Sequence, residues 1–309
     1  MDCDRCPEEA VTYIRYSGAH LCSSHFASFV EKRVKRQVRE QIRISKPTRI
    51  ACALSGGKDS SVALYLLHSI LGRRRDVELV AVTVDEGIHD YRPAGVASAE
   101  TLCEELGIEH RIITYRELVG WEMDAVVAAD PSTIPCSYCG VFRRKALNVL
   151  AKLADVDYLA TGLNLDDTVQ SILMNLGRAD LDRLARMGPH DNLQPGLVPR
   201  VQPLRMIPDK EVYLYAVLKG IRFHDGICPY AERALRTRYR EVLYMLERET
   251  PGTRHAFLSS YESLKPFLAA QYPPADLSTC EKCGEPTVNK LCQSCKLVGR
   301  LATLSQKPA

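Results

Sequence analysis

The chain of 309 residues is poor in aromatic side chains, which make up 7% of it, and its only tryptophan is Trp121. No stretch approaches the roughly 18 consecutive apolar residues that a membrane-spanning helix needs, so no membrane association is expected. The first residues, Met-Asp-Cys-Asp-Arg-Cys, lack the basic and apolar regions of a signal peptide, which predicts a cytoplasmic protein. The formal net charge is only +3, so charge alone does not indicate a nucleic-acid-binding protein.

The rest of the composition is that of a globular protein, with 46% hydrophobic and 26% charged residues. This composition excludes a disordered tail and a collagen-like chain, and the length predicts about two domains. Cysteine, in contrast, is abundant, with 12 residues. In a reducing compartment, clustered cysteines more often bind metal or take part in chemistry than form disulfides, so their spacing must decide between these uses.

Two sets of cysteines, one at each end of the chain, have the spacing of zinc ligands. Each set consists of two short pairs, and each predicts a tetrahedral structural zinc site. The predicted ligands are Cys3, Cys6, Cys22 and His25 near the N-terminus, and Cys280, Cys283, Cys292 and Cys295 near the C-terminus. Gly18 and Gly284 offer the turns that such knuckles need. The alternatives are reduced surface thiols and, in place of His25, its neighbour His20.

Three further cysteines form an incomplete set. Cys136 and Cys139 are a single Cys-x2-Cys pair, and Cys228 lies among turn residues. Three such thiols are compatible with an iron–sulfur cluster that has one open iron, with a redox-active or persulfide pair, or with a third zinc site. Cys52 and Cys103 lie in apolar segments and are expected to be small core residues.

Strand-like and helix-like segments alternate through the centre of the chain, which predicts a parallel sheet covered on both faces. Strands are expected at 49–54, 78–85, 110–115 and 157–161, and helices at 61–70, 94–106, 141–154 and 166–176. The stretch 186–209 is rich in proline and glycine and is expected to be a loop. Further helices are expected at about 209–219, 231–249 and 255–270, and Pro273-Pro274 marks a boundary.

Two segments carry dense positive charge. Residues 29–45 form a helical pattern with an apolar stripe and a basic face, and Arg233–Arg240 is a second basic stretch. Each is either a solvated helix face or a surface that contacts phosphates.

The segment Ser55-Gly-Gly-Lys-Asp-Ser60 joins the first expected strand to the helix after it. Paired glycines let backbone N–H groups turn toward an anion, and the helix N-terminus adds roughly half a positive charge. The segment is not a Walker A loop, because Lys58 is followed by Asp59. A carboxylate here could hold Mg²⁺ on a pyrophosphate, which predicts attack at the α-phosphate of ATP. The alternative is a generic polar glycine turn.

This hexapeptide resembles the PP-loop of the ATP pyrophosphatases. Further motifs narrow the resemblance to the tRNA 2-thiouridine synthetases of archaea, eukaryotes and some bacteria, over essentially the whole chain. These motifs are Val84-Asp-Glu-Gly-Ile88, the Cys136/Cys139 pair, Thr161-Gly-Leu-Asn-Leu-Asp-Asp167, Cys228 and both terminal knuckles. One position departs from the family: Leu163 stands where a histidine is common, so any polar contact of that histidine is lost.

The resemblance implies an α/β fold with a doubly wound, Rossmann-like parallel sheet flanked by two zinc knuckles. The implied domains are an N-terminal knuckle (1–28), a basic helix and linker (29–48), an adenylation and thiolation domain (49–272) and a C-terminal knuckle (273–309). The implied ATP-binding residues are Ala53, Leu54, Ser55, Gly56, Gly57, Lys58, Asp59, Ser60, Val84, Gly162 and Asp167. Asp166 and Asp167 could instead cap the helix that follows them.

The resemblance also implies the chemistry. A uridine of tRNA, at wobble position 34 or T-loop position 54, is adenylated at C2 with release of pyrophosphate, and sulfur then replaces AMP. The implied catalytic residues are Lys58, Asp59, Arg143, Asp167, Cys136 and Cys228, with Arg144 and Lys145 as alternatives to Arg143. Cys136, Cys139 and Cys228 would hold a 4Fe-4S cluster with one open iron, or else form a persulfide pair.

The implied cofactors are ATP, Mg²⁺, the 4Fe-4S cluster and two structural Zn²⁺ ions. The implied partners are tRNA, a ubiquitin-like thiocarboxylated protein as sulfur donor, and a second copy of the chain in a homodimer. The competing interpretations are another PP-loop enzyme, such as a cytidine thiolase or a small-molecule synthetase, and a zinc-ribbon RNA-binding protein.

Overall fold

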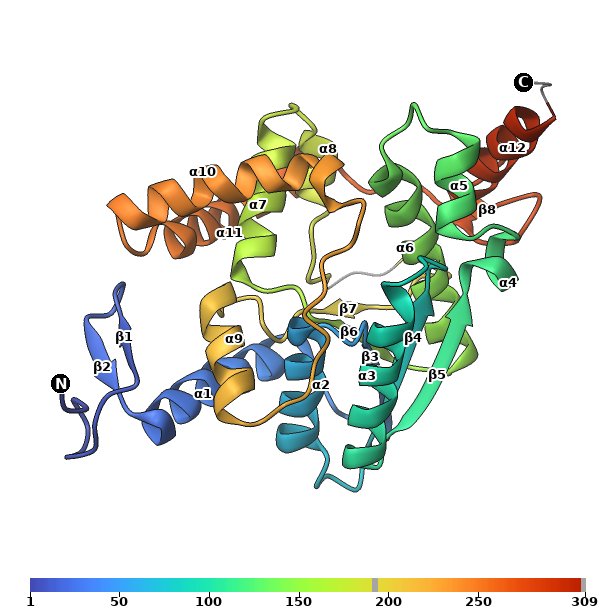
Figure 1. The fold of residues 1–309 in the computed structure, drawn as a ribbon. Helices are drawn as coiled ribbons and strands as arrows, with labels where there is room; N and C mark the ends of the chain where they lie inside the picture. Colours follow the sequence, from blue (N-terminus) through green and yellow to red (C-terminus); the bar gives the residue numbers. More distant parts are fainter. Residues whose placement is uncertain (191–193, 307–309) are drawn as a thin grey trace.

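A five-stranded parallel sheet forms the centre of the molecule (Figure 1), in the computed structural model that describes residues 1–190 and 194–306. The strands are β3 (Thr48–Ala53), β4 (Val77–Asp85), β5 (Glu109–Thr114), β6 (Tyr158–Thr161) and β7 (Arg200–Val201). Their order is β5-β4-β3-β6-β7, so the chain leaves β3 in one direction and returns to its other side. The doubly wound α/β fold is thereby confirmed, and such a reversal is where an open sheet binds its ligand.

Helices cover both faces of the sheet, because alternate residues of the central strands are buried on opposite sides. Ile50 and Cys52 of β3 belong to one core, and Ala51 belongs to the other. The first core includes residues of α1 (Ser23–Gln41), α2 (Lys58–Leu71), α3 (Arg92–Leu106) and α9 (Asp209–Leu218). The second includes residues of α4 (Tyr115–Val119), α5 (Met123–Ala129) and α6 (Pro135–Leu153). Cys52 and Cys103 are buried in the first core, as predicted.

A third core lies beyond the carboxyl ends of the strands. It is formed by α7 (Leu165–Leu176), α8 (Leu181–Ala185), α10 (Leu235–Glu249) and α11 (Thr253–Gln271), which pack side by side (Figure 1). A short 3-10 helix, Ala231–Arg233, precedes α10. The prediction of a loop over 186–209 was wrong at Arg200–Val201, because β7 pairs there with β6 as the edge strand.

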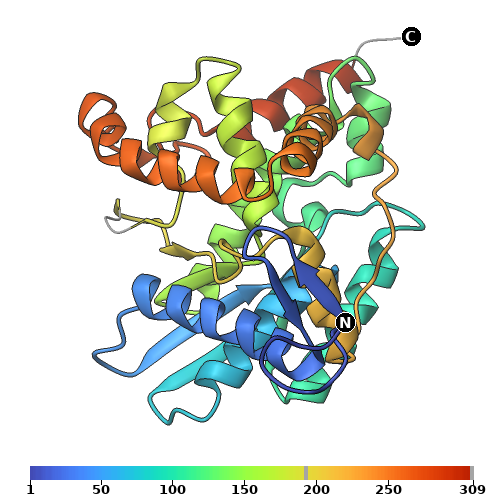
Figure 2. The same cartoon turned by 90° about the vertical axis from the view of Figure 1, so that its left-hand side faces the viewer.

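The two knuckles lie at opposite ends of the molecule (Figure 1). The first contains the hairpin of β1 (Thr12–Ile14) and β2 (Ala19–Leu21), and the second contains β8 (Ser278–Thr279), β9 (Pro286–Thr287) and α12 (Gln293–Ser305). Gly18 and Gly284 have φ of +69° and +71°, which confirms the turns expected there. Figure 2 shows the first hairpin lying near α1 and the α10–α11 pair.

Helix α1 begins earlier than predicted, at Ser23 rather than at residue 29, so the expected domain boundary at residue 28 falls inside it. The predicted apolar stripe is confirmed, because Val30, Val34 and Val38 are buried. Across the described residues, no helix is both long and apolar enough to span a bilayer.

Candidate active site

The predicted phosphate loop lies between the end of β3 and the start of α2. Gly56 has φ of +80°, and Gly57 is the residue that precedes the first turn of α2. The Ser60 hydroxyl accepts from the Ser55 amide at 3.0 Å and donates to the Gly57 carbonyl at 2.9 Å. The loop is therefore closed by its own side chains, with the N-terminus of a 14-residue helix behind it.

A segment from the far part of the sequence lies against this loop. The His224 amide donates to the Gly56 carbonyl at 2.7 Å, and His224 pairs with Gly57 as an isolated parallel bridge. Cys228 follows four residues later. The sequence analysis missed His224, since only the folded chain brings it to the loop.

Lys58 and Asp59 meet two residues that the sequence analysis also missed, Asn164 and Asp209. Lys58 Nζ lies 2.9 Å from both carboxylate oxygens of Asp59 and 2.6 Å from Asp209 Oδ1. Asn164 donates to the same two carboxylates, at 2.9 Å to Asp59 and 3.1 Å to Asp209. Burial lowers the pKa of Lys58, but the two carboxylates outweigh it and the pKa is raised. The carboxylates of Asp59 and Asp209, which both contact Lys58 Nζ, are oxygen ligands of the kind that binds Mg²⁺.

Asp166 and Asp167 were both candidates to cap the helix that follows them, but only Asp167 takes part in the cap. The Asn164 side chain caps α7, and the Asp167 carboxylate completes the capping box by accepting from the backbone N–H of Asn164 at 3.4 Å. Asp166 is not a cap: its carboxylate pairs with Arg254 at 2.8 Å and accepts from the Asp209 amide at 2.8 Å. Burial raises the pKa of Asp167 to about 6, so this carboxylate is still mostly ionised at pH 7.

A cavity of about 500 Å³ opens beside the phosphate loop, at the carboxyl ends of β3 and β4. Eight predicted site residues line it: Ala53, Leu54, Ser55, Val84, Cys136, Cys139, Arg143 and Cys228. Gly56, Gly57, Lys58, Asp59, Ser60, Gly162 and Asp167 do not line it but belong to the adjoining loop and its contacts. Arg236 connects the two groups, because it lines the cavity and lies 3.4 Å from Asp167 Oδ1.

The three unassigned thiols lie in the wall of this cavity. The helix expected at 141–154 begins earlier, at Pro135, so α6 carries Cys136 and Cys139 in its first turns. In the part of the chain that the structure describes, only the two terminal sets bring their ligand atoms within 4.8 Å of one another. At least one pair of the cavity thiols is therefore more than 4.8 Å apart, and cysteine thiolates are the ligand type that holds iron–sulfur clusters.

Glu86 links the phosphate loop to these thiols. Its buried carboxylate pairs with Arg92 at 2.8 Å and with Arg143 at 2.8 Å. Arg92 donates to the Ser55 carbonyl at 2.6 Å, and Arg143 donates to Cys139 Sγ at 3.2 Å. Burial lowers the pKa of Arg143, but Cys139 and Glu86 outweigh it and the pKa is raised. Of the three predicted cationic candidates, only Arg143 lines the cavity.

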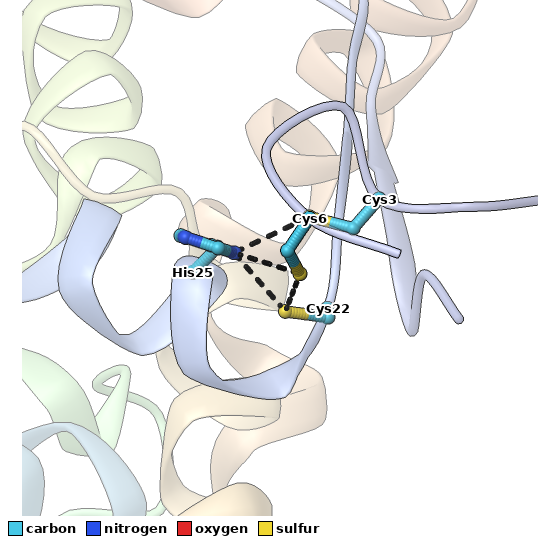
Figure 3. A group of neighbouring side chains, drawn as sticks. All are labelled: Cys3, Cys6, Cys22 and His25. Carbon is cyan, nitrogen blue, oxygen red and sulfur yellow. Dashed lines mark hydrogen bonds between the residues drawn. The ribbon is translucent and has the colours of Figure 1, made fainter. Parts of the chain in front are cut away.

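The N-terminal set of predicted zinc ligands converges on one point (Figure 3). His25 Nδ1 lies 3.4 Å from Cys3 Sγ, 3.4 Å from Cys6 Sγ and 3.3 Å from Cys22 Sγ. Ligand atoms on a tetrahedral zinc ion would be about 3.5–3.8 Å apart, given the usual Zn–S and Zn–N bond lengths. The C-terminal set converges in the same way, with Cys283 Sγ 3.6 Å from Cys292 Sγ. Each set therefore fits one zinc ion of its own.

The chain was compared with known proteins. Residues 30–246 match the family described as PP-loop domain, and residues 2–27 match the N-terminal LIM domain of the 2-thiouridine synthetase TtuA. The chain is 41% identical to the tRNA 2-thiolation protein NcsA of Haloferax volcanii, over 96% of this chain and 98% of that relative. The chain belongs to the PP-loop family of tRNA 2-thiolation proteins.

Two further relatives of this chain have names that give the tRNA position on which they act. This chain is 31% identical to the tRNA-5-methyluridine(54) 2-sulfurtransferase of Pyrococcus horikoshii, over 97% of this chain and 94% of that one. It is also 31% identical to the U34-tRNA thiolase NcsA from Methanococcus maripaludis, whose structure contains its 4Fe-4S cluster. The two structures agree with a TM-score of 0.84 over 97% of this chain and 96% of the other.

Gly162 provides a direct test of the phosphate loop. A Cβ there would lie 2.7 Å from the Ser60 amide nitrogen and 2.8 Å from the Asp59 carbonyl carbon. Gly162→Ala should therefore displace the start of α2, with a rise of about tenfold in the KM for ATP and a stability loss of about 1–3 kcal/mol. Steady-state kinetics with varied ATP and thermal unfolding would measure the two effects.

Gly299→Ala in α12 is the matched control, because an added Cβ there meets nothing within 4 Å. It should leave the KM for ATP unchanged and stabilise the protein slightly, by about 0.4–1 kcal/mol. An unchanged KM for ATP in Gly162→Ala would show that the close approach of Gly162 to α2 does not shape the nucleotide site.

Proposed function

We propose that this protein is an ATP-dependent tRNA sulfurtransferase that converts one uridine of tRNA to 2-thiouridine. The observation that carries the proposal is that one cavity is lined both by the end of β3, where the phosphate loop begins, and by Cys136, Cys139 and Cys228. A base that is first activated by ATP and then attacked by sulfur needs both sites within reach of one atom. Ser55 of the phosphate loop and the three thiols line the same cavity, which supports the proposal, and a phosphate loop or a thiol set alone would not.

In the proposed first half-reaction, the C2 oxygen of an extruded uridine attacks the α-phosphate of ATP. The bond between the α- and β-phosphates breaks and pyrophosphate leaves, while the base loses its N3 proton and carries AMP on its C2 oxygen. The amides of the phosphate loop and the N-terminus of α2 would bind the phosphates. Asp59 and Asp209 would hold Mg²⁺ on the leaving pyrophosphate, while Lys58 and Arg143 would stabilise negative charge on the transferred phosphate.

In the second half-reaction, sulfur bonds to C2 and AMP leaves with the former C2 oxygen. A 4Fe-4S cluster held by the three thiols would supply an open iron where hydrosulfide can bind. Arg143 would keep its place beside Cys139 through the buried carboxylate of Glu86. The alternative without a cluster is a persulfide on one cysteine, with a second cysteine that resolves it.

The two knuckles would hold structural zinc and support the cavity from opposite ends. In the first knuckle, the Tyr16 hydroxyl donates to Glu211 at 2.6 Å, which ties the knuckle to the helix that begins with Asp209. In the second, Glu285 accepts from Asn148 at 2.8 Å and from Lys152 at 3.0 Å, both on α6. Loss of either ion would therefore loosen a helix that carries site residues.

Several expectations stay predictions: the domain boundaries, the ubiquitin-like sulfur donor, the homodimer, the cytoplasmic location and phosphate contacts by the two basic stretches. Within those stretches, Arg33 is already engaged, because it donates to Tyr16 at 2.6 Å and lies 2.7 Å from His255 Nε2. Arg236 is held against α7. The side chain of Arg233 lies outside the described residues.

The decisive experiment combines the reconstituted protein, ATP, Mg²⁺, sulfide and unmodified tRNA without oxygen, followed by mass spectrometry of nucleosides from tRNA fragments. We expect 2-thiouridine in the fragment that contains position 34 or position 54, together with AMP and pyrophosphate. A product of 2-thiocytidine would support a cytidine thiolase instead. Binding of tRNA without any turnover of ATP would support an RNA-binding protein and contradict the proposal.

A further inference from the structure

Among the described residues, two arginines from separate elements, Arg144 and Arg200, are in contact beside the site without a carboxylate partner. Arg144 lies on α6, Arg183 on α8 and Arg200 on β7. Arg200 Nη2 lies 3.5 Å from the Arg144 carbonyl oxygen, and Arg183 pairs with Asp180 at 3.2 Å. Among the described residues, no carboxylate lies within 4.0 Å of the Arg144 or Arg200 guanidinium group.

Neighbouring positive charges affect the pKa of both Arg144 and Arg200. Desolvation by neighbouring groups lowers the pKa of Arg144 although its side chain keeps contact with solvent, and the charges of Arg183 and Arg143 lower this pKa further. Burial and the charge of Arg144 lower the pKa of Arg200 in the same way. An anion between the two guanidinium groups would offset the repulsion and the lost solvation.

The two arginines lie next to the cavity, outside its wall. Arg144 is one helical turn after Gly140, which lines the cavity, and a Cβ on Gly140 would lie 3.4 Å from Arg144 Nη1. Arg143, its neighbour on α6, faces the cavity, so the two adjacent arginines serve different places.

The chain fixes this arrangement before any ligand binds. Asn148 of α6 donates to the Gly196 carbonyl at 3.2 Å and accepts from the Val198 amide at 3.4 Å. This holds the segment before β7 on α6. Arg200 then enters the sheet in register with Leu159 of β6. A binding site built on a helix and a strand loses little conformational freedom when its ligand arrives.

We propose that Arg144 and Arg200 bind a backbone phosphodiester of the tRNA, next to the uridine that enters the cavity. The proposal rests on the proposed function, because that function places a tRNA base in the cavity. Guanidinium groups match phosphate oxygens with paired N–H donors. Such a contact positions the strand and does not read its sequence. The two arginines after the Cys-x2-Cys pair would thus have different roles. Arg143 would stabilise the transferred phosphate, and Arg144 would bind the tRNA backbone.

The test is the double variant Arg144→Gln/Arg200→Gln in the full-length holoprotein. Its matched control is Arg73→Gln/Arg75→Gln, which removes the same charge from exposed residues at the amino ends of the strands. The Kd for unmodified tRNA is measured over a series of salt concentrations, together with the KM for ATP and inhibition by inorganic pyrophosphate. Because Arg144 is exposed, the single variant Arg144→Gln provides a second, milder perturbation of the same site.

We expect the double variant to bind tRNA about tenfold more weakly or worse, as for the loss of charge-assisted hydrogen bonds. The negative slope of log K against log salt should become less steep, by about one for each lost phosphate contact. The KM for ATP should not change, the control should match the wild type, and Arg144→Lys/Arg200→Lys should recover part of the affinity.

Equal tRNA affinity and salt dependence in the double variant and the control would overturn the inference. So would an effect confined to ATP and pyrophosphate, because the bound anion would then belong to the nucleotide. Failure of the wild-type protein to form any thiolated nucleoside would instead contradict the proposed function. An active wild type with an unaffected double variant would contradict only the phosphate site.

Discussion

Asp59→Ala is expected to abolish tRNA-dependent release of pyrophosphate, with a fall in rate on the order of 10³-fold. The carboxylate lies at the start of α2, where a Mg²⁺ ion would offset the charge of the leaving group. Lys58 should stay in place in this variant, because Asp209 holds its Nζ at 2.6 Å. The loss would therefore report the missing carboxylate and not a displaced lysine. Pyrophosphate release with and without tRNA measures the effect.

Asp59→Asn separates charge from shape, because the amide can still accept from Asn164 but is a poor ligand for Mg²⁺. It should be nearly as inactive as Asp59→Ala. Asp76→Asn, at an exposed pair with Arg74 beyond the other end of the sheet, should keep full activity. Undiminished pyrophosphate release in both Asp59 variants would remove this carboxylate from the mechanism.

Cys228→Ala is expected to affect the other half-reaction. Without the third thiol, the visible absorbance of an anaerobically reconstituted cluster should be lost, and formation of 2-thiouridine should fall by at least about 100-fold. Pyrophosphate release should persist, because the His224 amide still contacts Gly56 and supports the phosphate loop. Loss of pyrophosphate release in Asp59→Ala, and loss of thiolation with pyrophosphate release retained in Cys228→Ala, would assign adenylation to the phosphate loop and sulfur transfer to the thiols.

Cys103→Ala is the matched control for loss of a thiol, since Cys103 is buried in the core of the sheet and lies outside the cavity wall. It should keep both the cluster spectrum and thiolation. A cluster that forms equally well in Cys228→Ala would show that the assignment of Cys228 as a ligand is wrong. A wild-type protein that thiolates tRNA without any cluster spectrum would favour the persulfide route.

The elements that sequence reasoning predicted well are those whose signal is local. β3 and β4 are each one continuous, largely apolar run, and the glycines before α2 follow β3 within a few residues. The knuckle ligands were also predicted as sets, because two residues between ligands leave only a tight turn. In each of these cases the signal itself lies within a few residues, as in the two short ligand pairs of each knuckle.

The errors have equally specific causes. β7 is only two residues long and lies in a Pro- and Gly-rich stretch, so its pairing with β6 provides its strand character. Helix α6 begins at Pro135, a residue that favours the first helical position, and this signal was not used. The role of Asp166 was left open between helix cap and site residue, because its partner, Arg254, lies on α11, 88 positions further along the sequence.

By itself the sequence determined the fold class, the phosphate loop, the two metal knuckles and the family, since each depends on spacing or periodicity within a short segment. Only the tertiary structure decided which distant groups act together. It brought Cys228 to the wall shared with Cys136, placed Asp209 on Lys58, and aimed Arg143 and Arg144 at different places. The physical reason is that burial and charge pairing depend on the positions of all elements at once, and no window of sequence contains that information.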